Sequence, residues 1–167
     1  MTIELVRIDD RLIHGQIVQG WLKSVSIDRI LVVSDEVAAD KMQCVLLSMA
    51  VPGSVKLSIK TIKDAAMEII NNVYENEKTM ILLSNPQDIV KLIDCGVKFK
   101  SINIGGMHFV RGKKQLLQNV SVDENDIKAL IKLISLGIEL ENRALPHDER
   151  NDISLIIKKE AEILKLV

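Results

Sequence analysis

The residue types best suited to chemistry lie together near the start of the chain, in the segment RIDDRLIHGQ at positions 7–16. Histidine can act as a nucleophile that forms a covalent intermediate, and neutral imidazole is available near neutral pH without special help. An arginine beside it can hold the negative charge of a phosphoryl group. The segment therefore predicts a phosphoryl carrier, with His14 as the nucleophile and Arg11 stabilising the phosphoryl charge.

A plainer interpretation of the same residues stays open. A single histidine between charged residues in a loop is more often an ordinary surface residue. Arg7 can also form a simple salt bridge with Asp9 or Asp10, worth at most about 1 kcal/mol when it is exposed. The functional interpretation rests on the clustering of these residues, because all of them fall at one junction between a predicted strand and a predicted helix.

Short apolar runs alternate with longer segments of helical periodicity along the chain. We predict strands at 3–9, 29–34, 54–59, 79–84, 101–104 and 120–122. We predict helices at 15–24, 35–50, 61–72, 85–96, 123–136 and 152–164. The run 138–145 alternates apolar and charged residues, which is typical of an edge strand and suits an antiparallel one.

This order of elements predicts an α/β fold. We expect an open, twisted, mostly parallel sheet with helices on both faces and an antiparallel edge strand, formed by residues 1–167 as a single domain. In such sheets, sites form where strands end and loops lead into helices. This rule directs attention to the loops that follow the first and fifth predicted strands.

The loop after the first strand holds most of the candidate site. Its helix start offers free backbone N–H groups and a partial positive charge, so the backbone of Gly15 and Gln16 is predicted to donate to the phosphoryl group. Gly15 also lets the backbone approach a ligand closely. Asp10 is expected to orient Arg11 or the imidazole, with Arg7 and Asp9 of this segment as possible walls of the site.

The loop after the fifth strand is expected to face the first loop. Gly105 and Gly106 permit an unusual backbone and a close approach, although a simple turn explains them about equally well. Met107 and His108 follow directly and are possible parts of the site wall. His108 is the weaker candidate for a second catalytic group.

Composition and motifs exclude several other classes of function. The net charge is −1 and aromatic residues make up 2% of the chain, which argues against nucleic-acid binding. No apolar run approaches the roughly 20 residues of a membrane span. Cys44 and Cys95 lie in apolar stretches, so we expect two buried thiols, and no metal-ligand spacing is present. No Walker motif or magnesium cage appears, so we expect no cofactor and a phosphoprotein as donor.

Four segments, in order and spacing, resemble those of one protein family: RIDDRLIHGQ at 7–16, VVSD at 32–35, NPQD at 85–88 and NIGGM at 103–107. They are similar to the IIB component of the mannose/fructose/sorbose family of the bacterial phosphoenolpyruvate-dependent sugar phosphotransferase system. The length fits one whole IIB domain. The resemblance implies the open, twisted, mostly parallel α/β sheet of that family.

The resemblance also implies a reaction. His14 would accept a phosphoryl group on Nδ1 from a phosphohistidine of the IIA component, with Asp10, Arg11 and the backbone of His14 and Gly15 binding the phosphate. It would pass the group to a sugar held by the membrane components IIC and IID. The implied protein is a cytoplasmic phosphotransferase that associates with a membrane permease complex. Mannose, fructose, sorbose and N-acetylated hexosamines are all sugars of this family.

Two functions of other classes stay as alternatives. One is a binding module that holds an anionic ligand at the first loop without chemistry. The other is a regulatory protein in which phosphorylation of His14 is a signal and not a transfer step. The sequence contains no specific motif for either of them, and it leaves the sugar and the oligomeric state open.

Overall fold

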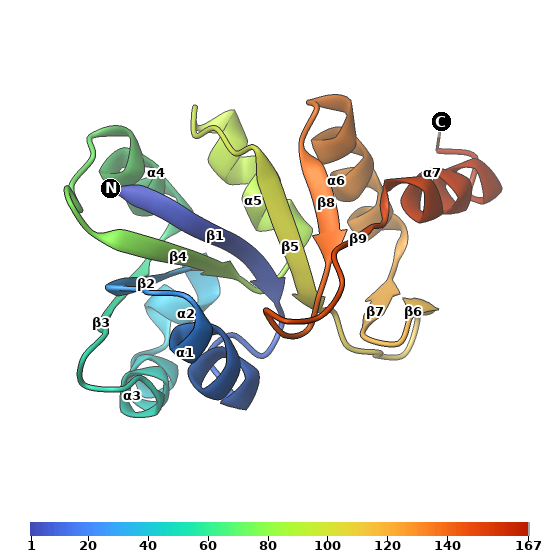
Figure 1. Cartoon of the computed structure of the whole chain (residues 1–167). Coiled ribbons are helices and arrows are strands. Elements are labelled where there is room, and N and C mark those ends of the chain that lie inside the picture. Colours follow the sequence, from blue (N-terminus) through green and yellow to red (C-terminus); the bar gives the residue numbers. More distant parts are fainter. Residues whose placement is uncertain (167) are drawn as a thin grey trace.

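The structure is a computed structural model that describes residues 1–166, and Figure 1 shows its layered α/β arrangement. The strands are β1 (Thr2–Asp9), β2 (Arg29–Val33), β3 (Lys56–Lys60), β4 (Lys78–Leu83), β5 (Ser101–Gly106), β6 (Lys114–Leu117), β7 (Val120–Val122), β8 (Glu139–Asn142) and β9 (Asn151–Asp152). The helices are η1 (Gln16–Trp21), α1 (Leu22–Ser24), α2 (Asp35–Ala39), α3 (Lys41–Ala50), α4 (Ile62–Ile70), α5 (Pro86–Asp94), α6 (Glu124–Ser135) and α7 (Ser154–Ile163).

Within residues 1–166, one seven-stranded sheet has the order β3-β2-β4-β1-β5-β8-β9, and β6 and β7 form a small antiparallel ribbon beside it. All neighbours from β3 to β8 are parallel, whereas β9 pairs with β8 in the antiparallel direction. The predicted mostly parallel sheet with an antiparallel edge is therefore confirmed. The sheet places β1 and β5 side by side, which brings their carboxyl ends together.

The edge strand itself was assigned to the wrong residues. The alternating run 138–145 contains β8, which is parallel to β5 and lies one strand in from the edge. The edge is the short β9. The alternation misled because Glu141 of β8 is not solvated: it is 2% exposed and pairs with Arg143, while Leu140 on the other face is fully buried.

Helices cover both faces of the sheet, as predicted. Strand residues alternate between two apolar cores. Ile81 and Leu83 pack in the core formed with α4, α5, α6 and α7, and Met80 and Leu82 pack in the core formed with η1, α2 and α3. This two-sided burial explains why β4 reads as a continuous apolar run, which is typical of a central parallel strand.

Two predicted helices have a different form in the structure. The segment 35–50 is not one helix, because Asp40 leaves the helical conformation and its carboxylate caps α3 by accepting from the N–H groups of Met42 and Gln43. The first helix begins as the π-helical turn η1 and only then becomes α1. Such turns are rare and often mark functional sites. The helices predicted at 85–96 and 123–136 are confirmed as α5 and α6, and the side chains of Asn85 and Asp123 cap their starts.

The expectation of two buried thiols is wrong. Cys95 is exposed because it is the C-cap residue of α5, and Cys44 is half-buried with its Sγ donating to the carbonyl of Val37 at 3.2 Å. In the described residues, no helix is both long and apolar enough to cross a membrane.

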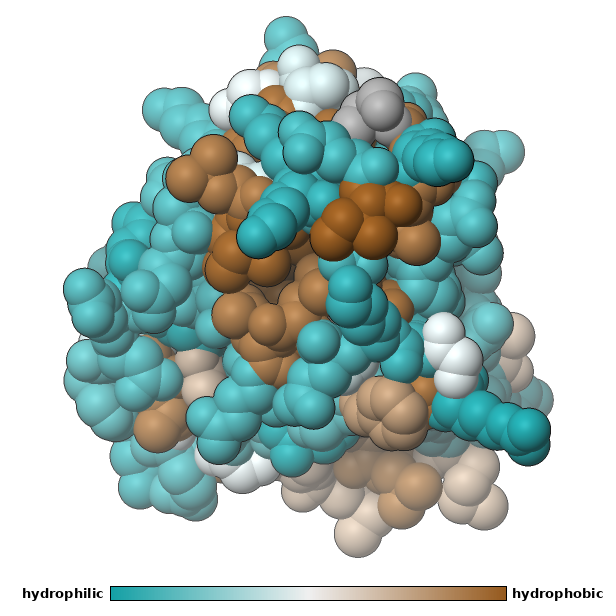
Figure 2. Space-filling view, turned by 90° about the vertical axis from the view of Figure 1, so that its right-hand side faces the viewer, coloured by the Kyte–Doolittle hydropathy of each residue, from teal (hydrophilic) through white to brown (hydrophobic). Residues whose placement is uncertain are grey.

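Apolar side chains also lie on the surface formed by the last two helices. Figure 2 shows them gathered on the side of the molecule that carries α7. Leu155 and Ile163 are among the exposed apolar residues there. A shallow groove of about 330 Å³ lies between α6 and α7 and is bordered by Ile131 and Ile134 on the α6 side and by charged residues on the α7 side.

Candidate functional site

The candidate site lies where β1 and β5 end. Asp9 pairs with Gly106 across the two strands, and the N–H of Asp10 donates to the carbonyl of Gly106 at 3.1 Å. The chain then turns sharply: the N–H of Leu12 donates to the carbonyl of Asp9 at 2.9 Å, and Leu12 adopts a positive φ of 55°. That conformation is uncommon for a residue with a side chain. The turn directs His14 back over the end of β1.

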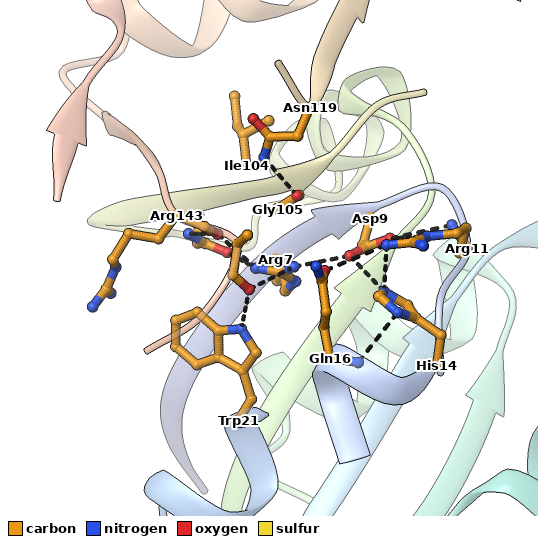
Figure 3. Close-up of polar contacts among 12 residues, drawn as sticks. Arg7, Asp9, Arg11, His14, Gln16, Trp21, Ile104, Gly105, Asn119 and Arg143 are labelled. Carbon is orange, nitrogen blue, oxygen red and sulfur yellow. Dashed lines mark hydrogen bonds and ion pairs between the residues drawn. The ribbon is translucent and has the colours of Figure 1, made fainter. Parts of the chain in front are cut away.

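Asp9 is the centre of this site (Figure 3). One carboxylate oxygen, Oδ2, lies 2.8 Å from His14 Nε2 and accepts a hydrogen bond of 2.9 Å from the Arg7 guanidinium. The other oxygen accepts from the backbone N–H of Arg11 at 3.3 Å. Burial alone would raise the pKa of the Asp9 carboxyl, but the hydrogen bond from His14 and the charge of Arg7 outweigh burial and hold the pKa below its ordinary value.

The contact with Asp9 decides which nitrogen of the neutral His14 ring carries the proton. A carboxylate can only accept, so Nε2 carries the proton and Nδ1 keeps its lone pair. The backbone N–H of Gln16 lies 3.4 Å from Nδ1. Arg11 is about half-exposed, and its guanidinium lies 3.5 Å from Nε2 and 3.3 Å from the side-chain oxygen of Gln16. A histidine held in this way can act as a nucleophile through Nδ1, with a guanidinium close to the ring.

Arg7 supports Asp9 from below and is fully buried. Besides Asp9, its guanidinium donates to the side chain of Asn103 and to the carbonyls of Arg143 at 2.9 Å and Ala144 at 3.3 Å. Burial lowers the pKa of Arg7, while the negative charge of Asp9 acts to raise it. The ion pair with Asp9 and these hydrogen bonds compensate for the burial of the guanidinium charge.

The single tryptophan of the chain completes the support. Its ring centroid lies 5.3 Å from the Arg7 guanidinium carbon and 5.1 Å from that of Arg143. Trp21 also donates from Nε1 to the carbonyl of Ala144 at 3.0 Å. Figure 3 shows this cluster beside Asp9 and His14. Cation–π attraction of this kind is stronger away from solvent.

The two glycines at the end of β5 have different roles. A Cβ at Gly105 would lie 1.7 Å from the Arg7 guanidinium carbon, so the guanidinium occupies the space that a side chain would need. A Cβ at Gly106 would lie 3.2 Å from both Asp9 Oδ1 and the ring of His108. Gly105 therefore makes room for Arg7, and Gly106 forms a wall of the site.

Other predicted site residues lie elsewhere or act differently. Asp10 orients neither Arg11 nor the imidazole of His14: its carboxylate accepts from the ring Nδ1 of His108 at 2.6 Å and from the backbone N–H of His108 at 2.7 Å. Asp9 takes the orienting position. Met107 does not line the site, because it is 2% exposed and belongs to the apolar core.

Gly15 is not required by its backbone geometry. It has an ordinary helical conformation, and a Cβ at this position would meet no atom within 4 Å. Outside regular helix and strand pairing, no hydrogen-bond partner is found among residues 1–166 for the backbone N–H groups of His14 and Gly15. The part that Gly15 can play is therefore donation from its backbone.

Sequence patterns did not identify the residues that surround Arg7 and so support the site. No role in the site is predicted from the sequence for Trp21, which lies in the helix predicted at 15–24, or for Asn103 and Arg143. A charged residue, Arg7, in the middle of an apolar strand was the signal that could have found them, since it must be paired when buried. Residues 1–166 contain no cluster of histidine, cysteine and carboxylate groups able to hold a metal ion.

The chain matches one family over nearly its whole length. Residues 3–166 match the family model described as "PTS system sorbose subfamily IIB component". The chain belongs to this family. A fructose-specific EIIB component of Bacillus subtilis is 44% identical to it over 158 residues, which cover 95% of this chain and 97% of that relative.

Two further relatives agree with this family membership. The mannose-specific EIIAB component of Escherichia coli K12 is 44% identical over 159 residues, which cover 95% of this chain but 49% of that longer protein. The solved IIBSor domain of the sorbose permease from Klebsiella pneumoniae has a TM-score of 0.89 at 37% identity and covers 95% of this chain and 98% of that one. The α/β fold is therefore that of a IIB component, a phosphotransferase part of a sugar uptake system.

The space at Gly105 gives a first prediction for this IIB component. We expect Gly105→Ala to lower the free energy of unfolding by about 3 kcal/mol, because the new methyl group displaces the buried Arg7 guanidinium. Urea unfolding followed by circular dichroism measures this change. Gly15→Ala is the matched control and should change stability by less than about 0.5 kcal/mol. Equal effects of the two substitutions would contradict the role given to Gly105.

The depressed pKa of Asp9 gives a second prediction. Ionised Asp9 stabilises the fold at and above the ordinary value of 3.8, and this contribution is lost as pH falls through the depressed pKa. Removing the charge leaves Arg7 buried without its carboxylate, so we expect Asp9→Asn to cost about 3 kcal/mol at neutral pH. Denaturant unfolding across an acid pH series should show this difference narrowing as the wild-type carboxyl is protonated.

The control for this series is a carboxylate on the surface. Asp94 pairs with Lys132 at 2.8 Å, and both side chains are about half-exposed. Asp94→Asn should therefore cost less than about 1 kcal/mol at neutral pH. A gap between wild type and Asp9→Asn that stays constant from neutral to acid pH would show that ionisation of Asp9 is not what stabilises the site.

Proposed function

We propose that His14 accepts a phosphoryl group from a phosphorylated IIA component and passes it to a sugar during uptake. The observation that carries this proposal is the 2.8 Å contact between Asp9 and His14 Nε2, which places the ring proton on Nε2 and leaves the lone pair on Nδ1, where the backbone N–H of Gln16 meets it at 3.4 Å. The reactive nitrogen would thus be the one expected from the family resemblance. The site also supplies the Arg11 guanidinium and, at the start of η1, the backbone N–H groups of His14 and Gly15.

The first step transfers the phosphoryl group to the chain. The P–N bond of the donor's phosphohistidine breaks as the Nδ1 lone pair of His14 bonds to phosphorus. The Nε2 proton stays in its hydrogen bond to Asp9, whose negative charge stabilises the charge that develops on the imidazole. Arg11 neutralises charge on the phosphoryl oxygens, and the fixed geometry reduces the entropy cost of the reaction.

The second step releases the group to the acceptor. The oxygen of a sugar hydroxyl bonds to phosphorus, the P–Nδ1 bond breaks, and its electron pair returns to Nδ1. The hydroxyl proton passes to water. Because Asp9 fixes the tautomer throughout, His14 returns to the same state and is ready for another phosphoryl group.

The partners are proposed from family membership. The Escherichia coli relative is named an EIIAB component, and this chain corresponds to about half of it, which supports a IIA component as the donor. The membrane components IIC and IID would hold the sugar, and the chain would work at the cytoplasmic side of that complex. Fructose, mannose and sorbose are named for the relatives and form the proposed class of substrate.

Labelling of His14 tests the proposal most directly. The wild-type chain should gain an acid-labile, base-stable phosphoryl group when it is incubated with phosphoenolpyruvate, the general carriers and the IIA component. His14→Ala should gain none, as measured by intact mass. His147→Ala removes an exposed histidine outside the site and should label like wild type. Labelling that persists in His14→Ala, or a wild-type chain that gains no mass, would overturn the proposal.

Arg11 is tested by the rate of transfer. Removing a donor that stabilises charge in the transition state typically slows a reaction by about 100- to 1,000-fold, and we expect this loss in Arg11→Ala. The fold should persist because the side chain is about half-exposed. Rapid-quench measurement of His14 phosphorylation gives the rate. Arg111→Ala, at an exposed arginine in the β5–β6 loop, is the control, and equal rates for both variants would remove Arg11 from the mechanism.

A further inference from the structure

A polar hollow lies beside the His14 site and has no part in the mechanism described so far. Its volume is about 420 Å³, and it opens between the start of η1, the β5–β7 segment and the loop from β8 to β9. Amide, imidazole and carboxylate side chains line it, among them Gln16, His108, Gln118, Asn142 and Glu149. A volume in this range suits a small-molecule ligand.

The hollow lies close to His14, although His14 itself does not line it. Gln16 borders it, and the backbone N–H of the same residue lies 3.4 Å from Nδ1. On the other side, a Cβ at Gly106 would stand 3.2 Å from both His108 and the carboxylate of Asp9. A molecule in the hollow would therefore lie next to a phosphoryl group carried on His14.

Several polar groups that line the hollow have no partner within residues 1–166. They are the side-chain amide of Gln118, the amide nitrogen of Gln16, the amide oxygen of Asn142 and the ring Nε2 of His108. Asp10 accepts from Nδ1 of His108, which leaves Nε2 as an acceptor. Donors and acceptors are thus mixed, as the hydroxyl groups of a polyol require.

The charges around the hollow favour a neutral ligand. Asp148 and Glu149 contribute carboxylates to its lining. Arg143 also borders it, but its guanidinium is taken up by the carboxylate of Glu141 at 2.9 Å and by the carbonyl of Pro146 at 3.1 Å. An uncharged polyol meets no repulsion here, whereas the same molecule carrying a phosphate would be repelled by the carboxylates.

We propose that this hollow is an acceptor subsite, in which hydroxyl groups of the incoming sugar are bound while another hydroxyl faces the phosphoryl group on His14. The inference rests on the proposed function and adds to it a role for this chain in choosing the acceptor. The same carboxylates that tolerate the neutral sugar favour departure of the phosphorylated product. Gln118 and Glu149 are exposed, so they can be replaced without disturbing the core.

Binding is tested first on the isolated chain by NMR. Fructose, mannose and sorbose are titrated in turn into isotope-labelled protein, and the side-chain amide signals are followed. At least one sugar should move the signals of Gln16, Gln118 and Asn142 with a saturable dependence, and the movement should be lost in Gln118→Ala/Glu149→Ala. No movement with any of the three sugars, or movement that occurs only when the IIA component is added, would overturn the subsite.

Transfer kinetics separate this inference from the proposed function. Phosphorylation of His14 by the IIA component should be within about twofold of wild type in Gln118→Ala/Glu149→Ala, because neither residue contacts the imidazole. Transfer to sugar in the presence of IIC and IID membranes should show KM raised about tenfold, as expected for two lost hydrogen bonds. The matched control is Gln43→Ala/Glu75→Ala, at exposed positions outside the hollow, which should keep the wild-type KM.

The two failures are distinguishable. A wild-type chain that never becomes phosphorylated on His14 overturns the proposed function. Normal phosphorylation together with the same KM in both double variants overturns only the acceptor subsite.

Discussion

A buried guanidinium beneath a buried carboxylate is the constraint on which the site depends. The side chains of Arg7 and Asp9 are not exposed to solvent, and Nη2 of Arg7 lies 2.9 Å from Oδ2 of Asp9. Two charges taken out of water are tolerated only with close pairing and further hydrogen bonds, and these are provided by Asn103 and by two backbone carbonyls. The position of the carboxylate, and through it that of His14, is therefore determined by the interior of the protein and not by the loop.

The order of the strands in the sheet brings together the groups that surround Arg7. Because β5 lies beside β1, a glycine at 105 can leave room for Arg7 and the chain after Gly106 can face the first loop. Because β8 follows β5 in the sheet, the carbonyls after Asn142 reach the same guanidinium. The site is thus supported by the three neighbouring strands β1, β5 and β8.

Much of this arrangement could be predicted from local patterns. The apolar run at 79–84 indicated a strand, Asn85 and Asp123 marked the starts of helices, and the residues from Arg7 to His14 indicated the loop of the candidate site. These signals are local, because each depends on the neighbours of a residue along the chain.

The errors have the opposite origin and concern contacts between distant segments. Asp9 and Asp10 have the same side chain, and only the register of β1 against β5 decides that the first meets His14 and the second meets His108. The alternation in β8 looked solvated for a related reason. Glu141 pairs with Arg143 only two residues along the chain, but its burial depends on the strands that flank β8. Burial of charged side chains is set by tertiary structure, which a sequence window does not contain.

Trp21 gives the protein an optical property. It is the single tryptophan of the chain, it lies within about 5 Å of two guanidinium groups, and its indole N–H is bound to the carbonyl of Ala144. Its emission therefore comes from one defined place, which is linked to the His14 imidazole by three contacts in sequence, through Arg7 and Asp9. The chain has a native fluorophore that reports on the electrostatic state of its own site without any attached dye.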